Sequence, residues 1–167
     1  MPGFILDNTV LSNFAAIGKT ELLAKLFQEN AFTTIEVVEE LKRGIEKGYR
    51  FLVPALSAAE TTKGWLEVLV LKSLEESRLR QELDEFLHPG ESSCVVFAIS
   101  RDMILVTDDL AARKLAARRN VRLTGTVGLL VEMIRRNQMP LEEGNALLRQ
   151  LIDDGYRSPC DRLDDLV

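Results

Sequence analysis

Acidic residues stand where the elements of this chain are expected to begin or end, and carboxylates are the side chains that bind hard divalent cations. Asp7 follows the apolar run FIL, and Asp108 and Asp109 follow ILVT. Glu40 lies within TTIEVVEEL, and Glu91 opens ESSCVVFAIS. If these side chains meet at one edge of a parallel sheet, they can support metal-dependent hydrolysis of a phosphodiester.

A cluster of this kind would require a cation. Three or four carboxylates within a few ångströms repel one another and raise one another's pKa. Ligands that are all oxygen suit Mg²⁺ or Mn²⁺, and the lack of a His and Cys set argues against zinc. Such an ion lowers the pKa of the attacking water and stabilises the developing charge on the phosphate, so no covalent protein nucleophile is required.

Two hydroxyls and several basic residues extend the candidate site. Thr9 and Thr107 adjoin the acidic positions and can hydrogen-bond a carboxylate or a phosphate. Basic side chains supply positioning contacts to a nucleic-acid backbone, with little choice of sequence. The predicted contacts are Lys42, Arg43, Arg113, Lys114 and Arg118, together with Arg119.

Each acidic residue also has an ordinary structural role, which is the more common one when it is taken singly. Asp7 and either Asp108 or Asp109 can cap a helix, and Glu91 stands in a first turn, where the helix dipole favours a carboxylate. Glu40 alone is typical of a solvated helix surface. The functional hypothesis therefore depends on the joint placement of these residues.

Alternating short apolar runs and amphipathic segments predict a parallel α/β domain with helices on the faces of the sheet. Strands are expected at 4–6, 30–34, 65–71, 103–107 and 121–125. The run 65–71 is nearly all apolar, as expected for a strand covered on both faces. Residues 49–63 fit either a strand or a helix that starts after Pro54.

Several residues are predicted to begin or end helices. Thr33 has Glu36 three residues later, which is the pattern of a capping box. Thr126 can cap the helix that follows it, Pro140 can start the last helix, and Gly155 is placed to end that helix.

Length, charge and cysteine usage restrict the class of protein. With 167 residues, 46% of them hydrophobic, we expect one domain over 1–167 with a helical extension at about 140–167. The net charge of -5 argues against simple coating of nucleic acid. Cys94 and Cys160 match no metal or disulfide spacing. No apolar run approaches the roughly 20 residues that span a bilayer, so a cytoplasmic location without a membrane partner is expected.

The sequence resembles the PIN domains, small metal-dependent ribonucleases, and within them the VapC-like toxins and their stand-alone relatives. The resemblance covers nearly the whole chain in order, through FILDNTVLSNFAAIGKTELL, TTIEVVEEL, HPGESSCVVFAIS, ILVTDDLAARKLA and GTVGLLVEMIRR. It implies a three-layer α/β/α sandwich whose five-stranded parallel sheet has the order 3-2-1-4-5.

The resemblance also implies roles for the acidic residues. Asp7, Glu40, Glu91 and Asp109 would be the four acidic ligands and catalytic groups, with Asp108 as the competing candidate for the fourth position. Many relatives carry Asp where this chain has Glu91. Relatives carry Thr or Ser where this chain has Asn8, whereas Thr9 fits the family's hydroxyl position.

By resemblance the chain is expected to be a Mg²⁺- or Mn²⁺-dependent endoribonuclease acting on single-stranded or structured RNA. The same resemblance implies a homodimer, and extends to toxins that pair with a small antitoxin protein. A second hypothesis is a PIN-like RNA- or protein-binding module without turnover. A third, an aspartyl-phosphate receiver domain, is disfavoured because the third strand ends in Lys72-Ser73 where that domain needs an Asp.

Overall fold

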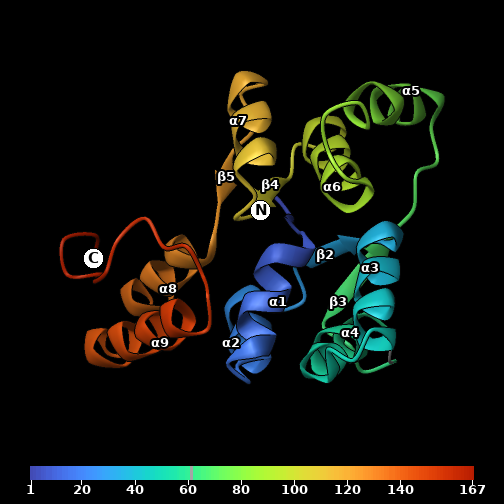
Figure 1. The fold of residues 1–167 in the computed structure, drawn as a ribbon. Helices are drawn as coiled ribbons and strands as arrows, with labels where there is room; N and C mark the ends of the chain where they lie inside the picture. The colour runs from blue at the N-terminus through green and yellow to red at the C-terminus, as the bar shows by residue number, and fades with distance from the viewer. Residues whose placement is uncertain (61) are drawn as a thin grey trace.

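One parallel sheet lies at the centre of the protein. The computed structural model describes residues 1–60 and 62–167, and within them five strands pair in the order β3-β2-β1-β4-β5 (Figure 1). The strands are β1 (Phe4–Leu6), β2 (Ala31–Thr34), β3 (Leu66–Leu69), β4 (Ile104–Val106) and β5 (Leu123–Thr124). All four pairings are parallel. The strand order that the family resemblance implied is confirmed.

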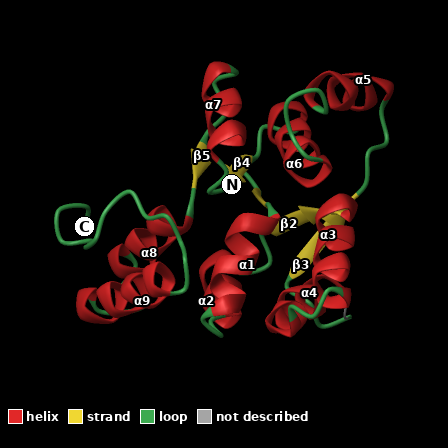
Figure 2. Cartoon of the chain, viewed as in Figure 1, coloured by secondary structure: helices red, strands yellow, loops and turns green. Residues whose placement is uncertain are grey.

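Helices make every connection between consecutive strands, as parallel pairing requires (Figure 2). In Figure 1, α5, α6 and α7 lie at the top, α1 to α4 lie in the lower half, and α8 and α9 lie together to the left of α1 and α2. The sheet runs between these groups of helices, which gives a three-layer α/β/α sandwich. The helices are α1 (Asn8–Ala16), α2 (Thr20–Phe27), α3 (Ile35–Glu46), the 3-10 helix η1 (Arg50–Leu52), α4 (Val53–Glu60), α5 (Leu74–Leu83), α6 (Pro89–Ser100), α7 (Leu110–Arg118), α8 (Thr126–Arg135) and α9 (Leu141–Asp153).

The helix α6 is the most deeply buried connection. It carries the chain from β3 at one edge of the sheet back to β4, and it packs against β1, β2 and β4 on the way. A helix that is apolar on all sides must be covered on all sides, and Cys94, Val95, Val96 and Phe97 are fully buried. This crossing places the first turn of α6 close to the carboxyl ends of the central strands.

The chain reverses direction across the sheet between β1 and β4. It leaves β1 toward β2 and β3, and it returns to β4 on the other side of β1. Leu6 and Val106 are in register, and the Asp7 amide donates a hydrogen bond to the Val106 carbonyl at 3.1 Å. Such a switch point forms the binding crevice of an open α/β sheet, so the residues that follow these two strands line its natural site.

Two predicted helix caps are wrong. The cap of α3 is Thr34, whose hydroxyl accepts from the Val37 amide at 3.2 Å. Thr33 instead donates its hydroxyl hydrogen to the Leu6 carbonyl at 2.8 Å, because successive strand residues face opposite sides of the sheet. Thr126 is already inside α8, where Gly125 is the capping position.

The strand β3 lies at the edge of the sheet and is not covered on both faces as its composition suggested. Of its residues, Leu66 is buried whereas Glu67 is exposed. The ambiguous segment 49–63 forms the helices η1 and α4, with residue 61 outside the described residues. The helix alternative for this segment is therefore confirmed, although α4 begins at Val53 and so includes Pro54 instead of starting after it.

The C-terminal part of the chain is helical where predicted and packs onto the core. Pro140 precedes α9, and Gly155 follows its end. Leu148 of α9 and Leu163 beyond it are fully buried. That residues 1–167 unfold as a single domain remains a prediction.

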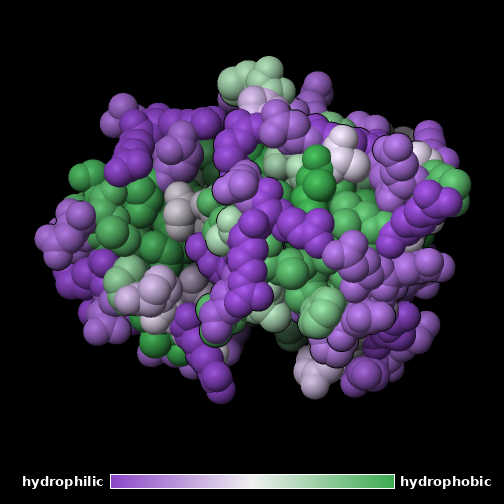
Figure 3. Space-filling view, turned by 90° about the horizontal axis from the view of Figure 1, so that it is seen from above, coloured by the Kyte–Doolittle hydropathy of each residue, from purple (hydrophilic) through white to green (hydrophobic). Residues whose placement is uncertain are grey.

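The surface is mixed in character. Seen from above, hydrophilic side chains dominate the outline of the molecule, and hydrophobic ones show in patches between them (Figure 3). Within residues 1–60 and 62–167, none of the helices combines the length and the apolar character needed to cross a membrane.

Candidate active site at the carboxyl edge of the sheet

Asp7 is a buried carboxylate at the switch point of the sheet. Its side chain is 1% exposed, and it caps α1. The Oδ1 atom accepts from the Thr9 amide at 3.0 Å, the Thr9 hydroxyl at 2.6 Å and the Val10 amide at 3.4 Å, while Oδ2 accepts from the Thr107 hydroxyl. Four donors thus hold the carboxylate in one orientation.

Burial dominates the electrostatics of this group. Desolvation raises the pKa of Asp7 from 3.8 to about 7, against the hydrogen bonds from Thr107, Thr9 and Val10, which lower it. The neighbouring Asp108 adds a further rise. A carboxylate whose charge is this unfavourable gains most when a cation compensates it.

The two hydroxyl residues predicted to support the site join Asp7 to the turn after β4. The Thr9 hydroxyl donates to Asp7 and accepts from the Asp108 amide at 2.9 Å. The Thr107 hydroxyl donates to Asp7 and accepts from the Asp109 amide at 3.0 Å. Each hydroxyl therefore fixes one acidic residue of the β4–α7 turn relative to Asp7.

Asp108 is turned toward the C-terminal half of the chain. Its Oδ1 atom accepts from the Thr126 amide at 2.9 Å and from the Tyr156 hydroxyl at 3.3 Å, and its Oδ2 atom accepts from the Asn13 amide group at 3.0 Å. This carboxylate thus satisfies the first amide of α8, which has no partner within the helix. With both oxygens engaged, Asp108 connects α1, α8 and the C-terminal segment.

Asp109 caps α7 and acts electrostatically on Glu91. Its Oδ1 atom accepts from the Ala112 amide at 2.7 Å as the cap of α7. Its charge also raises the pKa of Glu91, second only to the effect of burial on that residue. Of the two neighbouring aspartates, Asp109 is thus the one that interacts with Glu91.

Glu40 and Glu91 meet at the first turn of α6. The Glu40 Oε1 atom accepts from the Gly90 amide at 2.9 Å, and a Cβ atom on Gly90 would lie 2.5 Å from that oxygen. The Glu91 Oε2 atom accepts from the His88 amide at 3.1 Å. Burial, Asp109 and, more weakly, Glu40 raise the pKa of Glu91, and His88 opposes them. Glycine at position 90 is therefore what lets α3 bring its carboxylate to α6.

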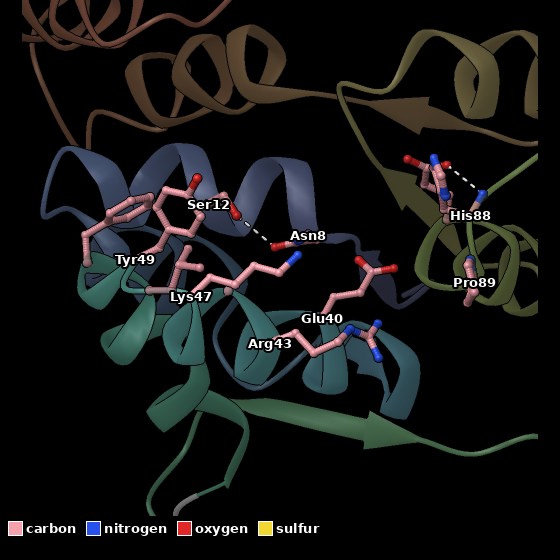
Figure 4. A pocket seen from close by; sticks show the side chains of 12 residues that line it. Asn8, Ser12, Glu40, Arg43, Lys47, Tyr49, His88 and Pro89 are labelled. Atoms are coloured by element: carbon pink, nitrogen blue, oxygen red, sulfur yellow. Dashed lines mark hydrogen bonds between the residues drawn. The ribbon is translucent and has the colours of Figure 1, made fainter.

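A pocket of about 520 Å³ opens beside these two glutamates (Figure 4). Asn8 and Ser12 of α1 line it on one side, and the Ser12 hydroxyl donates to the Asn8 side chain at 2.7 Å. Glu40 and Glu91 line it, whereas Asp108 lines a separate pocket of about 420 Å³. Asp7 lies buried beneath the surface.

The predicted basic residues have different surroundings. Arg43 lines the pocket beside Glu40. Lys42 is paired with Glu60 at 2.7 Å, and Arg113 donates to the Thr107 carbonyl at 2.8 Å. The remaining three lie on or just after α7: Lys114 and Arg118 are exposed, and Arg119 pairs with Glu82 at 2.6 Å.

Sequence reasoning missed most of the residues that line the pocket, among them Lys47, Tyr49, Phe51 and His88. Lys47 and Tyr49 lie in or beside the segment whose structure was ambiguous, and His88 was indistinguishable from an ordinary loop residue. One signal in the sequence points to His88: it stands directly before Pro89 and two residues before Gly90-Glu91, and Pro at a first helical position marks the helix start.

The chemical type of the acidic side chains is suited to a hard divalent cation. The side chains are carboxylates, which suit Mg²⁺ or Mn²⁺, and the raised pKa values of Asp7 and Glu91 mark positions where negative charge lacks compensation. In the described residues, no three His, Cys, Asp or Glu side chains form a group arranged to hold a metal ion. Each carboxylate instead accepts hydrogen bonds from the protein, and ligation would exchange some of them.

Comparison with known proteins bears on nearly the full length of the chain. A family model described as a PIN domain matches residues 3–167. Among curated proteins, no match to the chain is found.

Proposed function

The chain belongs to the PIN-domain family, whose members are generally nucleases, and we propose that it is a divalent-metal-dependent endoribonuclease. The observation that carries the proposal is the buried Asp7 carboxylate, which stands at the switch point of the sheet with its pKa raised to about 7. A stable fold retains such a group where a bound cation or a reaction requires it.

We assign the cation to Asp7, Glu40, Glu91 and Asp109, with Mg²⁺ or Mn²⁺ as the ion. When bound, the ion would supply a lower pKa for the attacking water and compensation for the charge that develops on the phosphate. Thr9 and Thr107 keep the Asp7 carboxylate in its orientation. Asp108 is left out of this set because it lines a separate pocket, where Thr126 and Tyr156 donate to it, and we assign it to holding the turn after β4.

Cleavage of labelled RNA tests this assignment directly. The wild-type protein should cleave in Mg²⁺ or Mn²⁺ and stop in EDTA, and Asp7→Asn should abolish cleavage. Asp102→Asn is the matched control, because Asp102 is an exposed aspartate whose partner is Arg122. Cleavage that persists in EDTA or in Asp7→Asn would show a contaminating nuclease and remove the assignment.

The proposal includes a toxin role in the cytoplasm, a homodimer and an antitoxin protein, all supported by the family resemblance alone. Expression of the wild type should arrest growth, and expression of Asp7→Asn should not. Light scattering should report twice the 18.8 kDa mass of one chain. Equal growth of both strains would contradict the toxin role. A monomer at micromolar concentration would contradict the homodimer.

The alternative of a binding module without turnover also has an observation in its favour. All five carboxylates already accept hydrogen bonds from the protein: Asp7, Glu40, Glu91, Asp108 and Asp109. Calorimetric titration with Mn²⁺ separates the two functions. The nuclease requires metal binding that Asp7→Asn weakens, whereas RNA binding without metal binding or products would favour the module.

A further inference from the structure

The pocket beside Glu40 carries two aromatic rings that the proposed cleavage chemistry does not use. Tyr49 is 56% exposed and Phe51 is 44% exposed, and both line the pocket. Their ring centroids lie 6.1 Å apart with the planes at 68°, which is an edge-to-face pair. Two large aromatic side chains left open to solvent beside a candidate active site form a surface on which a flat ligand can stack.

The backbone holds this aromatic pair in place. The Tyr49 amide donates to the Gly44 carbonyl of α3 at 3.0 Å. A Cβ atom on Gly44 would lie 2.6 Å from the Leu52 side chain, so glycine there lets η1 pack closely against α3. Leu52 is buried while its neighbour Phe51 faces solvent. The two rings are therefore presented from a fixed turn between α3 and α4.

Two cations in the same pocket lack carboxylate partners. Arg43 and Lys47 are exposed and line the pocket. Neither forms an ion pair with an acidic residue within the described ranges 1–60 and 62–167. The adjacent Lys42, by contrast, pairs with Glu60 at 2.7 Å. Cations that are not engaged within the protein are available to an anionic ligand.

These groups stand in a definite order along the pocket. In Figure 4, Tyr49 lies at one end, His88 and Pro89 lie at the other, and Glu40 lies between them. The Lys47 side chain extends from the Tyr49 end toward Glu40. The Arg43 side chain ends below Glu40 in the same view, so a ligand that reaches from the aromatic end to Glu40 passes Lys47 and arrives beside Arg43.

We propose that this pocket is a subsite for one unpaired nucleotide of an RNA strand, whose base stacks on the Tyr49 ring with its edge against Phe51, and whose adjoining phosphates contact Arg43 and Lys47. The inference rests on the proposed function, since it places a phosphate beside Glu40. Aromatic faces interleaved with cations are what single-stranded nucleic-acid sites use. Bases in an RNA duplex are stacked on one another and cannot reach such rings.

Charge favours RNA over a protein as the occupant. The cations carry charge opposite to a phosphate backbone, and a volume of about 520 Å³ is in the usual range for a small-ligand pocket. Carboxylates of a second copy of this chain, whose net charge is -5, can also pair with the two cations, but an RNA strand joins anionic phosphates to flat bases that match the rings as well. A protein interface is accordingly the outcome that the test must be able to detect.

Equilibrium binding without cleavage is the appropriate measurement. Fluorescently labelled single-stranded RNA of about ten nucleotides, and a duplex of the same length, are titrated with Asp7→Asn protein in EDTA, so that the affinity does not depend on turnover. Tyr49→Ala should weaken single-strand binding about 5- to 100-fold, Tyr49→Phe should retain it, and duplex binding should change less than about twofold. Lys47→Ala should reduce the dependence of log affinity on log salt by about one.

Matched controls use exposed residues outside the pocket. Phe86, which is 67% exposed, controls for loss of an aromatic ring, and the exposed Arg149 of α9 controls for loss of a cation. Alanine at either position should leave the affinity for single-stranded RNA within about twofold of the parent. Thermal unfolding of each variant shows whether the fold is retained.

The outcomes separate this inference from the proposed function. If the wild type cleaves RNA but Tyr49→Ala changes neither affinity nor cleavage, the subsite is wrong and the nuclease stands. If nothing cleaves but single-strand binding still depends on Tyr49, the subsite stands and the nuclease is wrong. Unchanged RNA binding together with a changed oligomeric state of Tyr49→Ala would assign the pocket to a protein interface and overturn the inference.

Discussion

Replacement of Asp7 by Asn should stabilise the metal-free protein even though it abolishes cleavage. The carboxyl is 1% exposed, and desolvation raises its pKa from 3.8 to about 7. At about 1.4 kcal/mol per pH unit, a charged Asp7 destabilises the folded state by about 4 kcal/mol. The substitution removes this penalty and weakens one hydrogen bond, that from the Thr107 hydroxyl, at a cost of about 1 kcal/mol.

The stability gained by Asp7→Asn should increase as pH rises. Because the folded pKa of Asp7 lies above the unfolded value, the folded state holds this proton more tightly than the unfolded chain does. The free energy of unfolding of the wild type therefore falls as pH rises from about 4 to about 7, and Asp7 contributes no further change above that. We expect the variant to be more stable by about 3 kcal/mol at pH 8 and by less than about 1 kcal/mol at pH 5.

Urea denaturation in EDTA at these two pH values measures the effect. Asp102→Asn is the control, because the Asp102 side chain is 92% exposed and its replacement should give a difference that does not depend on pH. Added Mn²⁺ should raise the wild-type midpoint more than that of Asp7→Asn. An Asp7→Asn protein that is less stable than the wild type at pH 8, or a difference that is equal at both pH values, would refute the argument from burial.

Three further substitutions test other parts of the description. Gly90→Ala places a methyl group 2.5 Å from the Glu40 Oε1 atom and should therefore lower the cleavage rate at least about tenfold. The unfolding free energy should change by less than about 1 kcal/mol, because Ala favours the helix. Full activity would show that Glu40 can move or is not needed. Tyr156→Phe removes a hydrogen bond to Asp108 and should cost about 1 kcal/mol in urea denaturation. Its cleavage rate should be unchanged, and a large loss would place Asp108 within the reacting site. Leu148→Ala should lower the unfolding free energy by about 2 to 5 kcal/mol, since this side chain of α9 is fully buried. Two separate transitions in that variant would contradict a single domain over 1–167.

Local sequence patterns predicted much of the architecture. Short apolar runs followed by capping residues predicted β1, β2, β4 and β5 within a residue or two of their positions, because strand and helix periodicity is a property of neighbouring residues. The position of Asp7 and of the two later aspartates directly after strands followed from the same patterns. The strand order came from the family resemblance, since periodicity alone does not say which strands pair.

The sequence-based predictions were wrong where the outcome depended on a shift of one residue along a strand or on whether a strand lies at the edge of the sheet. Thr33 and Thr34 are equally good capping types in the sequence, and only the pairing of β2 with β1 turns the Thr33 hydroxyl toward Leu6. The composition of β3 suggested a buried strand, but its place at the end of the sheet leaves Glu67 exposed. Such differences depend on neighbours that are distant in the chain.

The sequence by itself determined which side chains could bind a cation and that they would follow or flank parallel strands. Only the tertiary structure distinguished Asp108, held by Thr126 and Tyr156, from Asp109, whose charge raises the pKa of Glu91. The reason is that a carboxylate's surroundings depend on packing across the fold. Partners 18 and 48 residues further along the chain engage Asp108, whereas Asp109 caps α7 and raises the pKa of Glu91.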